Sequence, residues 1–266
     1  MGVDPASRWF RFLNRCHDPR LRLVCFPHAG GSASFFRAWA PFIPQDVELL
    51  AVRYPGREDR FSEPVVDTMA QLVEPLARDC SQLLGKPLAF FGHSMGASVA
   101  YEVALRMERD KGRGPRQLFV SGRSGPGSVV KRRRLADASD AELIADLQSL
   151  GGTRASVLDD PELRALTLPA VRADYSLIER YEASRSAVSA PIVAYFGGAD
   201  AYVGQDGVDA WASVTRSSFA RRSFPGGHFY LADHVQELVD DILARLAPPT
   251  RRGAGAPGAS PNTAAH

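Results

Sequence analysis

Short apolar runs alternate along the chain with longer stretches in which apolar residues recur at helical spacing. The short runs, bounded by turn residues, predict buried strands at Trp9–Leu13, Leu21–Phe26, Val47–Tyr54, Pro87–Phe91, Gln117–Ser121, Pro191–Phe196 and Ser217–Phe224. The longer stretches predict helices at about Ser34–Phe42, Thr68–Leu84, Met95–Arg109 and Tyr230–Leu246. Pro75 is expected to kink the second of these. The alternation favours an α/β fold with a mostly parallel central sheet flanked by helices on both faces.

One long segment interrupts this alternation, because about residues 123–190 contain no convincing strand. Ser139 and Glu142 form the capping-box pattern that opens a helix. Asp160-Pro161 and Leu168-Pro169 each predict the start of another helix, since proline is favoured in the first turn. This helical insert is expected to form a lid over one end of the sheet. An ordinary helical excursion along the flank is the alternative.

The length and composition fit one domain followed by a tail. The 266 residues are enough for one large α/β domain, which we place at 1–246. Residues 247–266 are rich in Ala, Gly and Pro and are predicted to be disordered. An apolar fraction of 45% is that of an ordinary soluble globule. A net charge of +2 gives no reason to expect nucleic acid as a partner.

The chain carries no sign of a membrane or secretory segment. No apolar run approaches the ~18 residues of a membrane span, and arginines interrupt the region where a signal peptide would need an unbroken apolar stretch. We expect a cytoplasmic protein without a membrane partner, and a monomer. Cys16, Cys25 and Cys80 are odd in number and lack metal-ligand spacing, so neither a disulfide framework nor a metal site is predicted.

The most informative motif is Gly92-His93-Ser94-Met95-Gly96, between a predicted strand and a predicted helix. A serine in such a sharp turn is held in a strained backbone with its hydroxyl lifted out of the sheet, and glycines on either side make room for it. Ser94 is therefore the candidate nucleophile. A tight Gly-Ser turn without chemistry is the alternative. His93 is expected to be structural, because its direction in the turn should carry it away from the hydroxyl.

A serine hydroxyl needs a base to accept its proton, and that base needs an acid to orient it. His228 follows the last predicted strand, and Asp200 follows the strand that ends at Phe196. The order Ser94, Asp200, His228 is the one used by α/β-hydrolases. Asp206 and Asp209 lie close enough in sequence to be alternative acids.

Two backbone amides must stabilise the oxyanion that forms during acyl transfer. Met95 supplies one as the residue after the nucleophile, and the loop Pro27-His28-Ala29-Gly30-Gly31 should supply the other. Ala29 is the expected donor, and Gly30 is the second choice. A plain glycine turn is the alternative interpretation of this loop.

Five blocks of the sequence together resemble a known family, the type II thioesterases. These are the discrete α/β-hydrolases that accompany polyketide and nonribosomal peptide synthases. The blocks are Cys25-Phe26-Pro27-His28-Ala29-Gly30-Gly31, Tyr54-Pro55-Gly56-Arg57-Glu58, Gly92-His93-Ser94-Met95-Gly96, Gly198-Ala199-Asp200 and Gly226-Gly227-His228-Phe229. They occur in family order across about Trp9 to Leu246, and the insert corresponds to the family's mobile lid.

The resemblance implies an activity and a partner. The family hydrolyses acyl groups from the phosphopantetheine arm of a separate acyl or peptidyl carrier protein, which clears stalled or mis-primed chains. Ser94 would attack the thioester, and His228 would accept its proton and later activate water. No cofactor of the enzyme's own is implied, since the substrate protein carries the phosphopantetheine. The basic run Lys131-Arg132-Arg133-Arg134 is a candidate surface for steering an acidic carrier protein.

Two other functions are compatible with the same residues. The first is an esterase or acyltransferase that acts on small substrates with the same triad. The second is a hydrolase-fold protein that binds ligands without turning them over, since a fold does not by itself fix a function.

Overall fold

The computed structural model describes residues 8–128, 134–151 and 160–247. Lys131, Arg132 and Arg133 of the basic run, and residues 248–266 of the predicted tail, lie outside the described residues. One seven-stranded sheet has the order β1-β3-β2-β4-β5-β6-β7. Its strands are β1 Phe10–Phe12, β2 Leu21–Phe26, β3 Val47–Val52, β4 Leu88–His93, β5 Gln117–Ser121, β6 Ile192–Gly197 and β7 Phe219–Phe224. Every strand expected from the apolar runs is present.

The sheet is parallel except at one edge. β1 pairs with β3 in antiparallel orientation, whereas the other neighbouring strands are parallel. Val24 of β2 lies opposite Phe90 of β4, which lies opposite Leu118 of β5. The α/β-hydrolase architecture predicted from the sequence is confirmed. Because parallel strands end at the same edge, the loops that follow β2, β4, β6 and β7 meet there.

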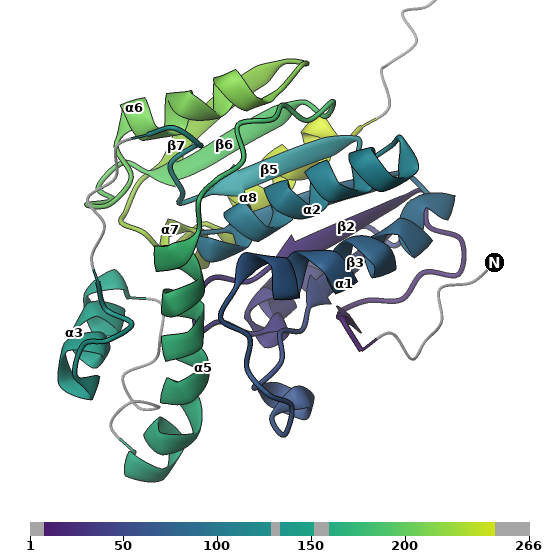
Figure 1. The fold of residues 1–266 in the computed structure, drawn as a ribbon. Helices are drawn as coiled ribbons and strands as arrows, with labels where there is room; N and C mark the ends of the chain where they lie inside the picture. The colour runs from purple at the N-terminus through teal and green to yellow at the C-terminus, as the bar shows by residue number, and fades with distance from the viewer. Residues whose placement is uncertain (1–7, 129–133, 152–159, 248–266) are drawn as a thin grey trace, which may run out of the picture.

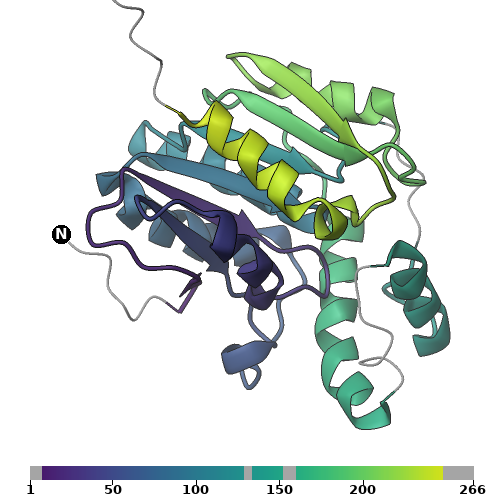
Figure 2. The ribbon, with the colours of Figure 1, turned by 180° about the vertical axis from the view of Figure 1, so that it is seen from behind.

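Helices cover both faces of the sheet (Figures 1 and 2). The elements are η1 Ala33–Phe42, η2 Glu58–Arg60, α1 Met69–Gln82, η3 Leu83–Gly85, α2 Met95–Lys111, α3 Asp140–Leu150, α5 Pro161–Arg180, α6 Gln205–Asp209, η4 Ala210–Val214, α7 Tyr230–Asp233 and α8 Val235–Arg245. α1 and α2 pack on one face, while η1 and α8 pack on the other.

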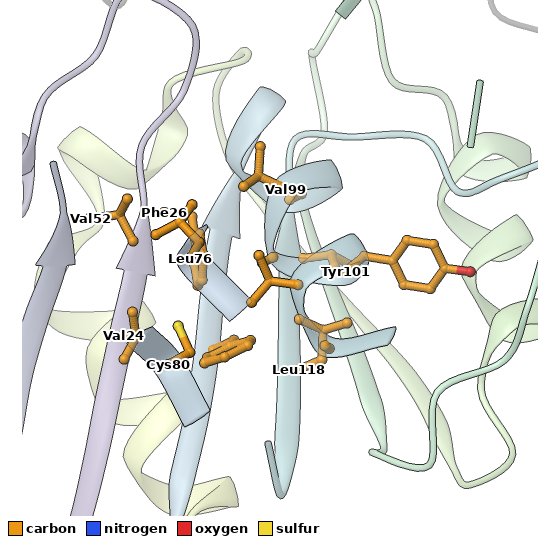
Figure 3. Close-up of a cluster of buried hydrophobic side chains, with 14 of the residues drawn as sticks. Val24, Phe26, Val52, Leu76, Cys80, Val99, Tyr101 and Leu118 are labelled. Carbon is orange, nitrogen blue, oxygen red and sulfur yellow. The ribbon is translucent and has the colours of Figure 1, made fainter. Parts of the chain in front are cut away.

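Alternation along the central strands divides the core between the two faces. Leu88 and Phe90 of β4 belong to the cluster beneath α1 and α2, whereas Ala89 and Phe91 belong to the cluster beneath η1 and α8. Figure 3 shows the first cluster, in which Val24 and Phe26 of β2 lie near Leu76 and Cys80 of α1. Cys25 is fully buried on the opposite face, as expected for a core residue.

Two helix predictions differ in detail from the structure. The stretch near Ser34–Phe42 is a 3-10 helix, and the C-terminal helix is broken into α7 and α8 at His234, which has φ −115° and ψ 36° outside the helical range. His234 is therefore a junction residue and not part of a continuous helical face. α1 contains Pro75 and continues beyond it to Gln82.

The insert is helical in its described parts, with α3 opened by the predicted capping box of Ser139 and Glu142. The prediction of a new helix at Leu168-Pro169 is wrong, because Pro169 lies inside the continuous α5. Proline removes one backbone hydrogen bond there, while Leu168 and Val171 bury their side chains against α3 and hold the helix together. α5 and α3 project beyond one end of the sheet in Figure 1, where a lid would lie.

Candidate active site

The turn between β4 and α2 has the geometry expected of a nucleophile elbow. Ser94 has φ +53° and ψ −118°, a conformation that residues with a Cβ rarely adopt. A Cβ on Gly92 would overlap the carbonyl oxygen of Gly96, and a Cβ on Gly96 would overlap that of Phe26 at the end of β2. Glycine is therefore required at both positions, as the spacing of the motif indicated.

The elbow is anchored to the neighbouring strand and opens a helix. The Ser94 amide donates to the carbonyl of Ser121 at 2.8 Å. Met95 is the first residue of α2, so its N–H has no carbonyl of a preceding helical turn to bond. The positive end of the α2 dipole lies at the same place. The elbow therefore provides the electrostatic environment in which a developing oxyanion is favoured.

Asp200 and His228 meet at the ends of β6 and β7. His228 Nδ1 lies 2.7 Å from Asp200 Oδ2, and the Asp200 side chain is fully buried. Asp200 Oδ1 also accepts a hydrogen bond from the Tyr202 amide at 2.9 Å. A Cβ on Gly197 would overlap the carbonyl of Gly227, so glycine allows the two loops to approach closely enough for this pair.

Ser94 and His228 line one cavity of about 650 Å³. Among the hydrogen bonds of the described residues, none joins the Ser94 hydroxyl to His228, whose side chain is 8% exposed. Proton transfer between them requires the hydroxyl to rotate or the two groups to approach. The sequence prediction that all three residues gather at one sheet edge agrees with this geometry, while their catalytic roles stay a prediction.

The loop after β2 borders the same cavity through His28 and Ala29. The N–H of Gly30 is already engaged, since it donates to Asp174 Oδ2 at 2.7 Å. Gly30, the second choice from the sequence, is thus occupied by a carboxylate of α5. Ala29 is left as the candidate partner of the Met95 amide.

Three imidazoles lie close together beside the elbow. The ring centroids of His93 and His228 are 5.0 Å apart, and those of His28 and His93 are 5.9 Å apart. Burial lowers the pKa of His28 to about 3, and the charges of His228 and Arg57 add to this effect. Burial also lowers the pKa of His93 far below its usual range. Both rings are therefore neutral at pH 7, which avoids repulsion of a proton held on His228.

His93 has a hydrogen bond away from the nucleophile. Its Nδ1 lies 2.9 Å from Ser121 Oγ, which is in turn 2.6 Å from the Tyr230 hydroxyl. His93 is completely buried. This arrangement fits the structural role expected for it.

The other sequence candidates lie in less favourable positions. Asp206 and Asp209 are exposed, and Asp209 is paired with Arg221. Across the described ranges, no group of three or more His, Cys, Asp or Glu side chains is arranged to hold a metal ion. None of the helices in the described part of the chain is both long enough and apolar enough to cross a bilayer.

The remaining wall of the cavity comes from the insert and was not predicted residue by residue. Leu147 of α3 and Tyr175 and Ile178 of α5 line it, together with Arg123 after β5. Arg57 and Asp174, which pair beside the loop after β2, were also missed as site residues. Arg57 lies in one of the five motifs, but nothing in the sequence connects it with a carboxylate 117 positions away.

The chain matches a known protein family over most of its length. The thioesterase domain model matches residues 21–246. The chain is 40% identical to thioesterase PikA5 of Streptomyces venezuelae over 92% of its own length and 88% of the relative. It is 34% identical to gramicidin S biosynthesis protein GrsT of Aneurinibacillus migulanus, over 92% of this chain and 96% of that one.

A comparison with solved structures shows that the fold is also that of a thioesterase. The structure of the type II thioesterase BorB from the borrelidin biosynthetic cluster matches with a TM-score of 0.80 and 36% identity. The match covers 90% of this chain and 98% of that one. With its elbow serine, its paired histidine and aspartate and its helical insert, the chain belongs to the thioesterase family as a thioester hydrolase of the type II group.

Proposed function

We propose that this enzyme hydrolyses acyl thioesters from the phosphopantetheine arm of a separate acyl or peptidyl carrier protein, using Ser94, His228 and Asp200. The observation that carries the mechanism is the 2.7 Å contact between Asp200 and His228 at the cavity into which the Ser94 elbow opens. The relatives named for gramicidin S and borrelidin biosynthesis support a synthase as the source of the carrier protein.

In the first half of the reaction, the Ser94 oxygen attacks the thioester carbonyl while His228 accepts the hydroxyl proton. Asp200 holds the imidazole in one orientation and stabilises its charged form. The amides of Met95 and Ala29 donate to the oxyanion of the tetrahedral intermediate. The carbon–sulfur bond then breaks and His228 passes its proton to the departing sulfur. This step leaves the acyl group on Ser94, releases the pantetheine thiol and returns the imidazole to its neutral form.

In the second half, His228 removes a proton from water as the water oxygen attacks the acyl-enzyme ester. The proton returns to Ser94 Oγ when the carboxylic acid leaves. A thiol with a pKa of about 8.5 is a far better leaving group than an alcohol, so the first step needs little acid catalysis and no metal. The cavity has no need of a cofactor for this chemistry.

The Ser94 hydroxyl must reach His228 for either half-reaction. Hydrogen bonds of a catalytic site are often long or misaligned without substrate and tighten in the reactive complex. A rotation of the hydroxyl about χ1 is the smallest movement that brings it toward the imidazole. The half-buried position of Ser94 within the cavity leaves room for this movement.

The test uses a panel of acyl carrier proteins that carry different acyl groups, with deacylation followed by intact-protein mass. The wild type should remove the acyl group from at least one carrier. Ser94→Ala should reduce the rate by about 10⁴-fold or more, and Asp200→Asn by about 10⁴-fold, because the imidazole loses its orienting partner. Asp206→Asn is the matched control, since this exposed carboxylate lies six residues further along the chain, in the first turn of α6.

Three outcomes would overturn the proposal. If Asp206→Asn and Asp200→Asn reduce the deacylation rate equally, Asp200 has no specific catalytic role. Faster turnover of a small oxygen ester than of the matching carrier-bound thioester would favour the small-substrate esterase. A wild-type protein that forms no acyl-enzyme with any activated ester would favour the non-catalytic binding protein.

A further inference from the structure

A buried ion pair connects the insert helix α5 to Arg57 in the loop that follows β3, and both of its side chains also bond the loop that follows β2. Asp174 Oδ2 accepts from Arg57 Nη1 at 2.6 Å, and Asp174 Oδ1 accepts from Arg57 Nη2 at 2.9 Å. The Asp174 and Arg57 side chains are only 3% and 11% exposed. A bidentate pair of this kind fixes both distance and orientation.

The same two side chains also hold the backbone of the loop at consecutive residues. Asp174 Oδ2 accepts from the Gly30 amide at 2.7 Å, and Arg57 Nη1 donates to the Gly31 carbonyl at 3.1 Å. The loop itself closes through a hydrogen bond from the Gly31 amide to the His28 carbonyl at 2.9 Å. Ala29, the candidate oxyanion donor, therefore lies inside a turn whose exit is held by the ion pair.

Packing against α5 supports the same connection. A Cβ on Gly30, which has φ +73°, would lie 3.0 Å from Val171 Cγ2, one turn before Asp174 on α5. Gly56, next to Arg57, has φ +79° and would place a Cβ 3.7 Å from the Ala170 side chain. The helix thus covers both loops at close range, and the Val65 side chain also packs against Gly56.

The residue after Arg57 holds the chain just beyond the loop. Glu58 Oε1 accepts from the Ser34 amide at 3.1 Å and from the Ser34 hydroxyl. Glu58 adopts φ +52°, which is unusual for a residue with a Cβ. Arg57 and Glu58 therefore hold Gly31 and Ser34 respectively, while Asp174 holds Gly30.

We propose that Asp174 and Arg57 are positioning residues that set the direction of the Ala29 N–H toward the oxyanion and make this direction depend on the position of α5. This inference rests on the proposed function. The ion pair touches neither the substrate nor the reacting atoms. It acts through the backbone between His28 and Gly31, whose rotation would turn the Ala29 amide away from the intermediate.

Through Asp174, the position of α5 affects the loop that carries Ala29. If α5 moves away from the sheet edge, Asp174 leaves Gly30 and Arg57, and the loop loses its support at the same moment. The second oxyanion donor is then in place only when the helix is seated. The C-terminal half of α5 is therefore part of the oxyanion site, and movement of the lid is compatible with catalysis only in segments that leave Asp174 in contact with Arg57.

The decisive measurement compares two pantetheine thioethers that differ only in fluorine. The trifluoroacetonyl thioether forms a hemiketal oxyanion with Ser94, whereas the acetonyl thioether binds as a ground-state ketone. Asp174→Asn and Asp174→Ala should weaken binding of the trifluoroacetonyl compound by about 10- to 100-fold. A small misplacement of a hydrogen-bond donor lowers transition-state affinity by a factor of this order. Affinity for the acetonyl compound should change by less than about twofold, and kcat should fall while KM stays near its wild-type value.

Glu48→Gln is the matched control. Glu48 is another buried carboxylate paired with an arginine, with Oε2 2.8 Å from Arg22 Nε, but it lies on β3 away from the site. Glu48→Gln should lower the stability of the protein without a selective loss of affinity for the trifluoroacetonyl compound. Arg57→Lys is a milder variant in case Asp174 is needed for folding, since lysine keeps the charge but loses the bidentate geometry. It should show the same selective loss to a smaller extent.

The proposed function and the positioning role of Asp174 and Arg57 would be contradicted by different results. A wild type that forms no hemiketal with the trifluoroacetonyl compound would overturn the proposed function. The positioning role alone would be overturned by a different result. In that result the wild type forms the hemiketal, and the Asp174 and Arg57 variants lose affinity for both compounds equally or for neither. Selective loss in Glu48→Gln of the same size would also overturn it, because the effect would then follow general destabilisation.

Discussion

The two walls of the cavity are built in different ways. We call the wall formed by the loops after β2, β4, β6 and β7 the floor, and the wall formed by α3 and α5 the roof. The floor is held by backbone contacts that only glycine permits, at Gly96 against β2 and at Gly197 against the β7 loop. The roof has its own small apolar cluster and is attached to the body by side chains.

This difference separates two kinds of stability. The floor cannot change without moving the central strands, so its integrity follows global unfolding. The roof cluster consists of four buried residues with partly buried neighbours, and such a unit can open locally at lower free energy than the whole domain. The candidate catalytic residues thus lie in the rigid part, and the proposed acyl-binding cavity takes part of its shape from the adaptable part. The buried pair at Asp174 is one of the places where the two parts are joined, and the ion pair of Arg180 with Asp67 is another.

The largest test of the floor is Gly96→Ala. The added Cβ would overlap the Phe26 carbonyl, which is backbone and cannot move aside, so we expect a loss of about 3 kcal/mol or more. Deacylation activity should fall with it, since the elbow and the β2 loop would separate. Gly85→Ala is the control, because a Cβ there meets nothing within 4 Å and should leave stability within about 0.5 kcal/mol. Equal denaturant midpoints for the two variants would show that the close approach is unimportant.

A second test uses the buried imidazole of the floor. His28 has a pKa of about 3 in the folded protein, below the ordinary value of 6.5, so the unfolded chain binds a proton that the folded chain does not between these two values. The stability that His28 contributes is present above pH 6.5 and is lost as the pH falls toward 3. His28→Phe should therefore reduce the slope of unfolding free energy against pH by about 1.4 kcal/mol per unit near pH 5. Urea unfolding at several pH values measures this slope.

The control for this test is His17→Gln, because His17 is exposed. Its slope should match that of the wild type. A wild-type slope in the His28→Phe variant would mean that His28 is protonated in the folded protein, or that its ring is accessible to water in that state.

The smallest test concerns the roof. Ser139→Ala removes one half of the capping box, the hydrogen bond that the Glu142 amide donates to the Ser139 hydroxyl. The other half, in which the backbone amide of residue 139 donates to the Glu142 carboxylate, stays possible. We expect a cost of about 1 kcal/mol, confined to α3. Amide hydrogen exchange should become faster in Asp140–Leu150 while strands β4 and β5 keep their protection. Equal acceleration in the strands would show that the roof and the floor unfold together.

The floor could be predicted from the sequence to a large extent, because its features are local. Buried parallel strands are continuous apolar runs, and the Gly-x-Ser-x-Gly turn between strand and helix specifies its own backbone. The order Ser94, Asp200, His228 followed from strands that end at one edge. The contact between Asp200 and His228 depends only on which loops meet there, and topology supplies that.

The roof and its attachments could be predicted only in outline. The sequence predicts a helix boundary within α5 at Pro169, since it shows the proline but not the apolar contacts with α3 that keep the helix intact. The break at His234 has no glycine or proline to announce it. Asp174 is one charged residue among many in a helical stretch, and its importance comes from a partner in a distant loop. Long-range polar pairs leave no periodic signal.

The positive φ of Ser94 lowers the stability of the fold at the same residue that supplies the candidate nucleophile. Glycine at this position would adopt the same backbone without steric conflict, so Ser94→Gly should fold more stably and catalyse nothing. Laboratory selection for thermal tolerance alone would thus discard the hydroxyl. Only selection for turnover keeps it.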